Sequence, residues 1–208
     1  GKTTVVCNII NNVVDSGHTA LVFTMEMTME QLQERMAGVK MGANVTQIIK
    51  GNQAVRDEAV QLTGAMMTSG RLLIDAHTDG IDEFCAKVRK AVRKHKVDLV
   101  VVDYIQRLRP RKSEGMVADT ASISKDVTRL AKRLKVPILC VSMESAGGLY
   151  GSRQLDYDAF GTLSVRRVGE DPAPPDYVSN VDVWVDKNRF GPSHLSLPLQ
   201  IVGRTGQV

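Results

Sequence analysis

The sequence predicts an α/β fold in which a mostly parallel sheet is flanked by helices on both faces. Short apolar runs alternate with amphipathic segments along most of the chain, which is the pattern of strand–helix–strand units. The runs are continuous rather than alternating, as in the Leu-Val-Val-Val stretch at residues 99–102, and this is typical of strands buried on both faces. With 208 residues, 43% of them hydrophobic, the chain can bury one sizeable core, so we expect a single domain over residues 1–208.

The expected elements follow from this periodicity and from the residues that interrupt it. Apolar residues repeat with helical spacing from residue 3 to residue 14, and Asp15-Ser16-Gly17 ends that helix. The next elements are expected as strand 20–25, helix 29–40, helix 54–69, strand 71–75, helix 81–95, strand 98–103, helix 118–135 and strand 137–142. We expect loops at 107–117 and at 144–161, the second because it is rich in glycine.

Three shorter β-like segments follow, at 162–167, 181–187 and 195–202. Valines alternate along the middle segment, and the turn-forming stretch 188–192 separates it from the last one. We therefore expect these segments to pair in antiparallel fashion, with a C-terminal hairpin.

Composition excludes several classes of protein. The chain has no apolar run of about 18 residues and no signal sequence before the first helix, so we expect a soluble cytoplasmic protein with no membrane partner. Cys7, Cys85 and Cys140 are odd in number, far apart and set among apolar residues. This favours buried, reduced thiols over a disulfide or a metal site.

Basic residues cluster in the first expected loop. The net charge of +4 is modest, and a solvated surface is enough to explain it. Four cations nevertheless share one proline-containing stretch: Arg107, Arg109, Arg111 and Lys112. A clustered basic loop indicates nucleic-acid binding more strongly than the total charge does.

The first four residues, Gly1-Lys2-Thr3-Thr4, match the end of the phosphate-binding pattern G-x-x-x-x-G-K-[ST], whose earlier positions are not in the sequence. In that loop the lysine binds phosphate oxygens and the next hydroxyl reaches Mg²⁺. A helix that begins here presents its positive dipole end to the anion. A chance match or an ordinary helix start is the alternative.

Two carboxylates stand where expected parallel strands end. Asp103 ends the run 98–103, a position from which an acidic residue holds Mg²⁺. Glu26 ends the earlier strand, and a carboxylate beside a phosphate can orient or deprotonate the attacking water. Because open parallel sheets bind ligands at their carboxyl ends, we expect Lys2 and Asp103 to meet at one edge. A cap or turn role for Asp103 and a solvent-facing Glu26 are the alternatives.

Lys187 and Arg189 lie at the expected hairpin tip. Residues two apart in a strand point the same way, so both cations could reach one anion. The alternative is that they are exposed charges that serve only solubility.

Together these segments resemble one family. Gly-Lys-Thr, Phe-Thr-Met-Glu-Met, Leu-Val-Val-Val-Asp-Tyr-Ile-Gln, Leu-Ala-Lys-Arg-Leu-Lys-Val-Pro and Lys-Asn-Arg-Phe-Gly-Pro occur in an order similar to that of the C-terminal RecA-like motor domain of DnaB-type replicative helicases. The resemblance implies a RecA-like P-loop fold, ATP and Mg²⁺ as cofactors, and DNA unwinding during replication. It also implies a truncated front, with the start of the phosphate loop and an N-terminal domain missing.

The resemblance also implies roles for individual residues. Gly1, Lys2, Thr3 and Thr4 would bind the nucleotide, Thr3 and Asp103 would hold Mg²⁺, and Glu26 would be the catalytic carboxylate. Lys187 and Arg189 would enter the site of a neighbouring subunit, with Arg189 as arginine finger. The DNA-binding residues would come from the two expected loops: Arg107, Arg109, Arg111, Lys112, Gly147, Gly148, Gly151 and Arg153.

The partners implied by the resemblance are single-stranded DNA, a homohexameric ring, primase and a helicase loader, in a bacterial or phage-infected cell. One departure concerns Met143, which stands where this family usually has a glutamine that senses the γ-phosphate. A thioether cannot donate that hydrogen bond. Two alternatives stay open: a recombinase-like or KaiC-like ATPase, and a DNA-binding ring module that no longer hydrolyses ATP.

Overall fold

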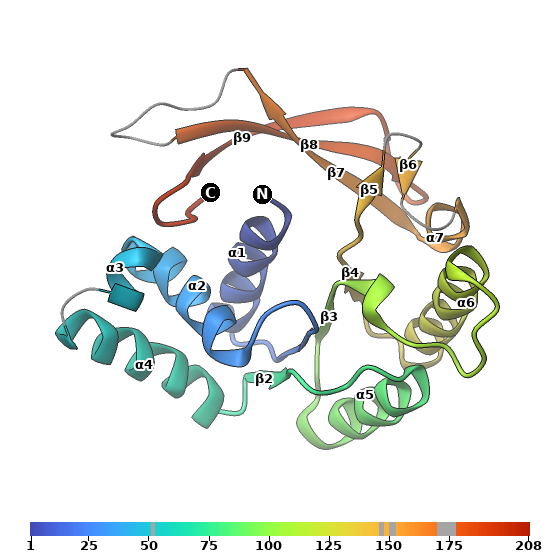
Figure 1. Ribbon diagram of the computed structural model, residues 1–208, viewed down its shortest axis with the longest axis horizontal. Helices are drawn as coiled ribbons and strands as arrows, with labels where there is room; N and C mark the ends of the chain where they lie inside the picture. Colours follow the sequence, from blue (N-terminus) through green and yellow to red (C-terminus); the bar gives the residue numbers. More distant parts are fainter. Residues whose placement is uncertain (51–52, 146–147, 150–152, 170–177) are drawn as a thin grey trace. The chain divides into compact units, whose positions relative to one another are not determined.

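The computed structural model describes residues 1–50, 53–145, 148–149, 153–169 and 178–208 (Figure 1). It divides into two compact units. The first unit comprises residues 1–12, 30–65 and 160–208, and the second comprises residues 13–29 and 66–159. A single domain over the whole chain stays a prediction.

A parallel sheet forms the centre of the second unit. Its strands lie in the order β2-β1-β3-β4, and each neighbouring pair is parallel. Their bounds are Ala20–Thr24 for β1, Leu72–Asp75 for β2, Leu99–Asp103 for β3 and Ile138–Cys140 for β4. Every residue of β1 and of β3 is buried, as expected for continuous apolar strands in the middle of a covered sheet. The predicted mostly parallel sheet is confirmed.

Helices α5 (Ile81–His95) and α6 (Met116–Leu134) share the main hydrophobic core with this sheet. Helix α5 turns Ile81, Phe84, Cys85 and Val88 inward, which is the spacing of one helical face. The ring of Phe84 meets that of Phe23 of β1 edge-on, with 4.7 Å between centroids. This packing fixes α5 against β1. Glu26 lies two residues beyond the end of β1.

The first unit combines helices with an antiparallel sheet. The helices are α2 (Met29–Met41), α3 (Val45–Lys50) and α4 (Gln53–Thr68), and a small core of Ala37, Ile48 and Ala59 lies among them. The strands β7 (Gly161–Val168), β8 (Val178–Asn188) and β9 (Leu195–Val202) pair in chain order. The first helix, α1 (Lys2–Asp15), begins in this unit. The predicted antiparallel pairing is confirmed.

Several short elements were not expected from the sequence. The segment 144–161, expected to be a loop, contains the paired strands β5 (Glu144–Ser145) and β6 (Gly148–Leu149) and the helix α7 (Arg153–Asp158). Helix α7 is held by tertiary contacts, since the Ser124 hydroxyl of α6 donates to Asp158 Oδ2 at 2.8 Å. Helix α3 and the 3₁₀ turn η1 (Ile105–Arg107) were also missed. Elements this short carry too few periods for a pattern to show.

Two expectations from composition can be compared with the burial of the chain. Cys7 and Cys85 are buried, as expected, whereas Cys140 at the end of β4 is half-buried. Within the described ranges, the helices are all too short or too polar to cross a membrane.

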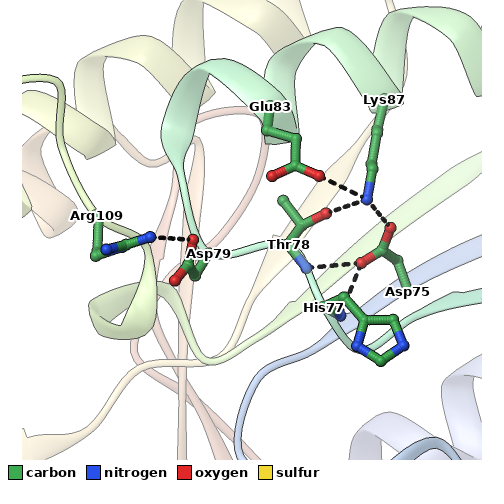
Figure 2. Close-up of polar contacts among 7 residues, drawn as sticks. All are labelled: Asp75, His77, Thr78, Asp79, Glu83, Lys87 and Arg109. Carbon is green, nitrogen blue, oxygen red and sulfur yellow. Dashed lines mark hydrogen bonds and ion pairs between the residues drawn. The ribbon is translucent and has the colours of Figure 1, made fainter.

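An ion-pair network ties β2 to α5. Lys87 Nζ lies 2.6 Å from Asp75 Oδ2 and 2.8 Å from Glu83 Oε1, and it donates to Thr78 Oγ1 at 2.7 Å (Figure 2). The backbone N–H groups of His77 and Thr78 donate to Asp75 Oδ1. Burial acts to raise the pKa of Asp75, but these hydrogen bonds, led by that of Lys87, outweigh it and lower the pKa to about 2.

This network predicts an acid-dependent loss of stability. Because the pKa of Asp75 is lower in the folded chain, its contribution is present above the unfolded value of 3.8 and disappears as the pH falls towards about 2. The contribution is on the order of 2 kcal/mol at neutral pH. Lys87→Met should therefore destabilise the protein by about 1–2 kcal/mol at pH 7 and flatten the change between pH 4 and pH 2.

Urea unfolding across this pH range measures the effect. Lys90→Met is the matched control, because Lys90 is exposed on the same helix one turn from the network. A Lys87 variant with the same pH profile as the control would show that the pair does not stabilise the fold.

Candidate functional site

The second unit brings two predicted acidic positions to one edge of the parallel sheet. Thr24, the last residue of β1, is paired in register with Asp103, the last residue of β3. The Met25 N–H donates to the Asp103 carbonyl at 2.9 Å, and the Thr24 hydroxyl donates to the Met27 carbonyl at 2.9 Å. The turn that carries Glu26 is therefore fixed beside the end of β3. Asp103 is 4% exposed, whereas Glu26 is exposed to solvent.

A second polar pair at this edge was missed by the sequence analysis. In η1, just after β3, the Gln106 side chain donates from Nε2 to Ser142 Oγ at 2.7 Å. The Ile105 N–H donates to the Val141 carbonyl at 3.0 Å, which anchors η1 at the end of β4. Met143 follows Ser142 and is 40% exposed. Gln106 could have been predicted to lie at this edge, because it is a polar residue three positions after the acidic residue that ends a strand.

In the first unit, the predicted phosphate-binding residues form the start of α1. Lys2 is exposed, and Thr3 and Thr4 are half-buried. Lys2, Arg35 of α2 and Arg167 of β7 place positive charge close enough to the backbone of residue 1 to act on it electrostatically. Positive charge here adds to the positive end of the helix dipole, so this end of α1 favours an anion. Arg35, which comes from α2, could not be assigned to this end of α1 from the sequence, whereas Arg167 of β7 stands out there as part of a small basic group with Arg166.

The two hairpin cations differ in their placement. Lys187 lies within β8 opposite Thr162 of β7, whereas Arg189 lies in the turn beyond Asn188, where β8 ends. The Arg189 N–H donates to the Phe160 carbonyl at 2.9 Å, and its guanidinium lies 5.3 Å from the centroid of the Phe160 ring. That both cations reach one anion stays a prediction.

The predicted basic loop is paired with acidic residues of the second unit. Arg109 Nη2 lies 2.7 Å from Asp79 Oδ1 (Figure 2), and Lys112 Nζ lies 3.1 Å from Glu114 Oε1. Arg111 makes two ion pairs of 2.7 Å, with Asp82 at the start of α5 and with Asp126 of α6.

The main chain also anchors this loop. The Arg109 N–H donates to the Asp79 carbonyl, and the Ile81 N–H donates to the Arg109 carbonyl. Arg107 donates from Nε to the Tyr104 hydroxyl at 2.9 Å. Sequence reasoning did not anticipate this pairing, because the acidic partners of Arg109 and Arg111 lie 15 to 30 positions away.

The second predicted DNA loop is only partly within the described residues. Gly148 lies in β6, and Arg153 is exposed at the first residue of α7. Gly147 and Gly151 lie outside the described residues.

Comparison with known proteins places this arrangement in a family. Residues 1–146 match the family model described as the DnaB-like helicase C terminal domain. The chain is 26% identical over 152 residues to the replicative DNA helicase DnaC of Bacillus subtilis (strain 168), covering 71% of this chain and 34% of that protein. It is 24% identical over 222 residues to a probable plasmid replicative DNA helicase of Chlamydia muridarum (strain MoPn / Nigg), covering all of this chain and 48% of that protein. The chain thus spans about a third to a half of these relatives.

Solved structures agree on the fold. One solved ATPase domain superposes with a TM-score of 0.81 at 20% identity, covering 100% of this chain and 79% of that one. A second solved structure, of a DnaB-like replicative helicase and its interactions with primase, has a TM-score of 0.81 at 19% identity. The match covers 100% of this chain and 55% of that one. The fold is that of the RecA-like helicase ATPase domains, and the family model spans well over half of the sequence. The chain belongs to the DnaB-like helicase C-terminal domain family.

Proposed function

We propose that this chain is the ATP-hydrolysing motor part of a replicative DNA helicase, which translocates on single-stranded DNA and unwinds the duplex. The observation that supports this best is the edge of the parallel sheet, where the buried Asp103 ends β3 beside the turn that carries Glu26. In a chain of this family, an acid at a strand end and a second carboxylate in the turn after the neighbouring strand suit metal binding and activation of water.

The nucleotide is proposed to be ATP, held by residues 1–4 at the start of α1. Lys2 would bind phosphate oxygens, while Thr3 and Asp103 would offer oxygen ligands to Mg²⁺. Among the described residues no group of three or more His, Cys, Asp and Glu side chains could hold a metal. A site with few protein ligands fits Mg²⁺, which keeps several waters and binds substrate phosphates. The ion would neutralise charge on the phosphates, and Glu26 would accept the proton of the attacking water.

The nucleic-acid ligand is proposed to be single-stranded DNA, bound by the basic loop at 107–112 and by residues around Gly148 and Arg153. The phosphates would replace the acidic partners of Arg109 and Arg111. For Arg109 this exchange costs little because the side chains of its pair with Asp79 are 73% and 52% exposed, and exposed ion pairs contribute at most about 1 kcal/mol. A homohexameric ring would carry one such loop per subunit. Primase and a helicase loader are proposed as its protein partners.

The test uses the full-length gene product and measures ATP turnover with and without a single-stranded oligonucleotide, and the affinity for that strand at rising salt. We expect DNA to stimulate turnover and affinity to fall steeply with salt, because phosphate contacts release counterions. Arg111→Ala should weaken binding about three- to tenfold and reduce the salt dependence, whereas Asp82→Asn should tighten binding by about two- to threefold.

Arg93→Ala is the matched control, since Arg93 is an exposed arginine at the far end of α5. If the Arg111 variant bound single-stranded DNA as tightly as this control, the basic loop would not belong to the DNA-binding site. Turnover that no strand stimulates would refute the helicase proposal. In electron micrographs, open filaments on DNA instead of closed rings would favour a recombinase-like ATPase.

A further inference from the structure

A turn after β9 touches the start of α1 within the first unit. We call residues 203–207 the Gly206 turn. The Asn8 side chain donates from Nδ2 both to the Thr4 carbonyl, at 2.9 Å, and to the Gly206 carbonyl, at 2.8 Å. The second bond joins positions 198 residues apart. One side chain therefore links the first turn of α1 to the Gly206 turn.

Gly206 also packs so closely against α1 that a Cβ atom there would make tight contacts. Its φ is +73°, and a Cβ atom there would lie 3.3 Å from Thr4 Cγ2 and 3.2 Å from Val39 Cγ2. Both neighbours are methyl groups on β-branched side chains, whose χ1 rotamers are restricted in a helix. Val39 in particular has little freedom to rotate aside, so a Cβ at position 206 would press on α2 through Val39 and on α1 through Thr4.

The Gly206 turn is itself well anchored. The Gly206 N–H donates to the Val202 carbonyl at 2.7 Å, and the Val202 N–H donates to the Gln207 carbonyl at 3.0 Å. The Gln207 side chain covers Gly42, whose hypothetical Cβ would lie 3.1 Å from Gln207 Nε2. Thr205 is 9% exposed. The Gly206 turn is thus held in place by its own hydrogen bonds, and the start of α1 packs against it.

We propose that the Gly206 turn and Asn8 position the phosphate-binding end of α1, and that the close contact and the positive φ together favour glycine at position 206. The inference rests on the proposed function, in which Lys2 and Thr3 bind the nucleotide phosphates and Mg²⁺. Thr4 follows both residues in the first helical turn, so a displacement of Thr4 moves Lys2 and Thr3 with it. Gly206 and Asn8 are positioning residues and do not touch the nucleotide.

The effect of a small displacement is large at such a site. A misplacement of about 1 Å, far from the chemistry, can cost about 100-fold in rate. A Cβ at Gly206 requires its neighbours to yield by a few tenths of an ångström. We expect Gly206→Ala to raise the Kd for nucleotide by about five- to tenfold, because displaced phosphate-binding groups make longer and weaker hydrogen bonds.

The experiment measures the Kd of the full-length protein for fluorescent ADP with Mg²⁺, together with thermal stability. Gly70→Ala is the matched control, because Gly70 has the same φ of +73° but no heavy atom within 4 Å of a hypothetical Cβ. Both substitutions place an L residue at a φ of +73°, and the Gly206 position adds the contacts with Thr4 and Val39. Gly70→Ala should leave the Kd within about twofold of the wild-type value.

A double-mutant cycle identifies Thr4 as the residue that transmits the effect. Thr4→Ser removes Cγ2 and keeps the hydroxyl, so the Kd increase caused by Gly206→Ala should shrink in that background. Asn8→Ala gives a second measurement if Gly206→Ala does not fold. It should raise the Kd without lowering the stability of α1, since alanine favours helix, and Asn12→Ala on the exposed side of α1 is its control.

The outcomes separate this inference from the proposed function. If Lys2→Ala does not weaken nucleotide binding, both fail. If Lys2→Ala weakens binding while Gly206→Ala matches Gly70→Ala, or Asn8→Ala matches Asn12→Ala, only the positioning role is overturned. A raised Kd confined to Gly206→Ala and Asn8→Ala, relieved by Thr4→Ser, is the expected result.

Discussion

Glu26→Gln should abolish ATP turnover by the full-length protein while leaving nucleotide binding intact. The amide keeps the size of the carboxylate but cannot accept a proton from water, and loss of a positioned general base costs about 100- to 10,000-fold. The substitution should not disturb the fold, because Glu26 is exposed in a turn that is fixed by the Thr24 and Met25 hydrogen bonds. Phosphate release at saturating ATP and single-stranded DNA, together with a nucleotide titration, measures both effects.

Lys2→Ala gives the complementary result. Lys2 is exposed at the start of α1, so its removal should also leave the fold intact, but it should weaken nucleotide binding as well as turnover. The control is Glu58→Gln, an exposed carboxylate on α4. If Glu26→Gln and the control turned over ATP at the same rate, Glu26 would not be the catalytic carboxylate. Wild-type behaviour of both Lys2→Ala and Glu26→Gln would refute the proposed site.

Arg189→Ala should reduce turnover by about 1,000-fold or more with little change in nucleotide affinity. An arginine finger stabilises charge that develops in the transition state, and its contribution is about 10³- to 10⁵-fold. Arg189 lies in an exposed turn, with its guanidinium over the Phe160 ring, and Phe160 stacks on Phe190 with 5.6 Å between centroids. This aromatic support holds the turn without burying the charge, as a residue acting on a neighbouring subunit requires.

Mixing two inactive variants tests whether Arg189 acts in trans. When Arg189→Ala and Glu26→Gln subunits assemble together, some sites receive a native Glu26 from one subunit and a native Arg189 from its neighbour. Turnover should then recover to a measurable fraction of wild type. No recovery would show that both residues serve the site of their own subunit. Arg129→Ala, an exposed arginine on α6, controls for the loss of positive charge.

The sequence was sufficient for the parallel sheet and for the ends of β2 and β3, whereas β1 and β4 end one and two residues earlier than expected. The run at 99–102 is continuous and apolar because a central strand is covered on both faces, so its end at Asp103 could be located without a structure. The amphipathic face of α5 and the antiparallel strands were predicted for the same reason, since burial imposes a period on the residues. The short helix α7 has no such period and forms because α6 lies beside it.

Local sequence by itself determined which residue types carry the chemistry: a lysine and a threonine that open a helix, carboxylates that end strands, and a cluster of cations. Only the tertiary structure decided how they are surrounded. It paired Arg109 and Arg111 with acids from α5, its preceding loop and α6, and it set Gly206 against Thr4 across most of the chain. The physical reason is the distance along the sequence over which each feature is determined. Hydrophobic periodicity and strand ends depend on neighbouring residues. Ion pairs and close contacts between distant segments form only when the chain folds.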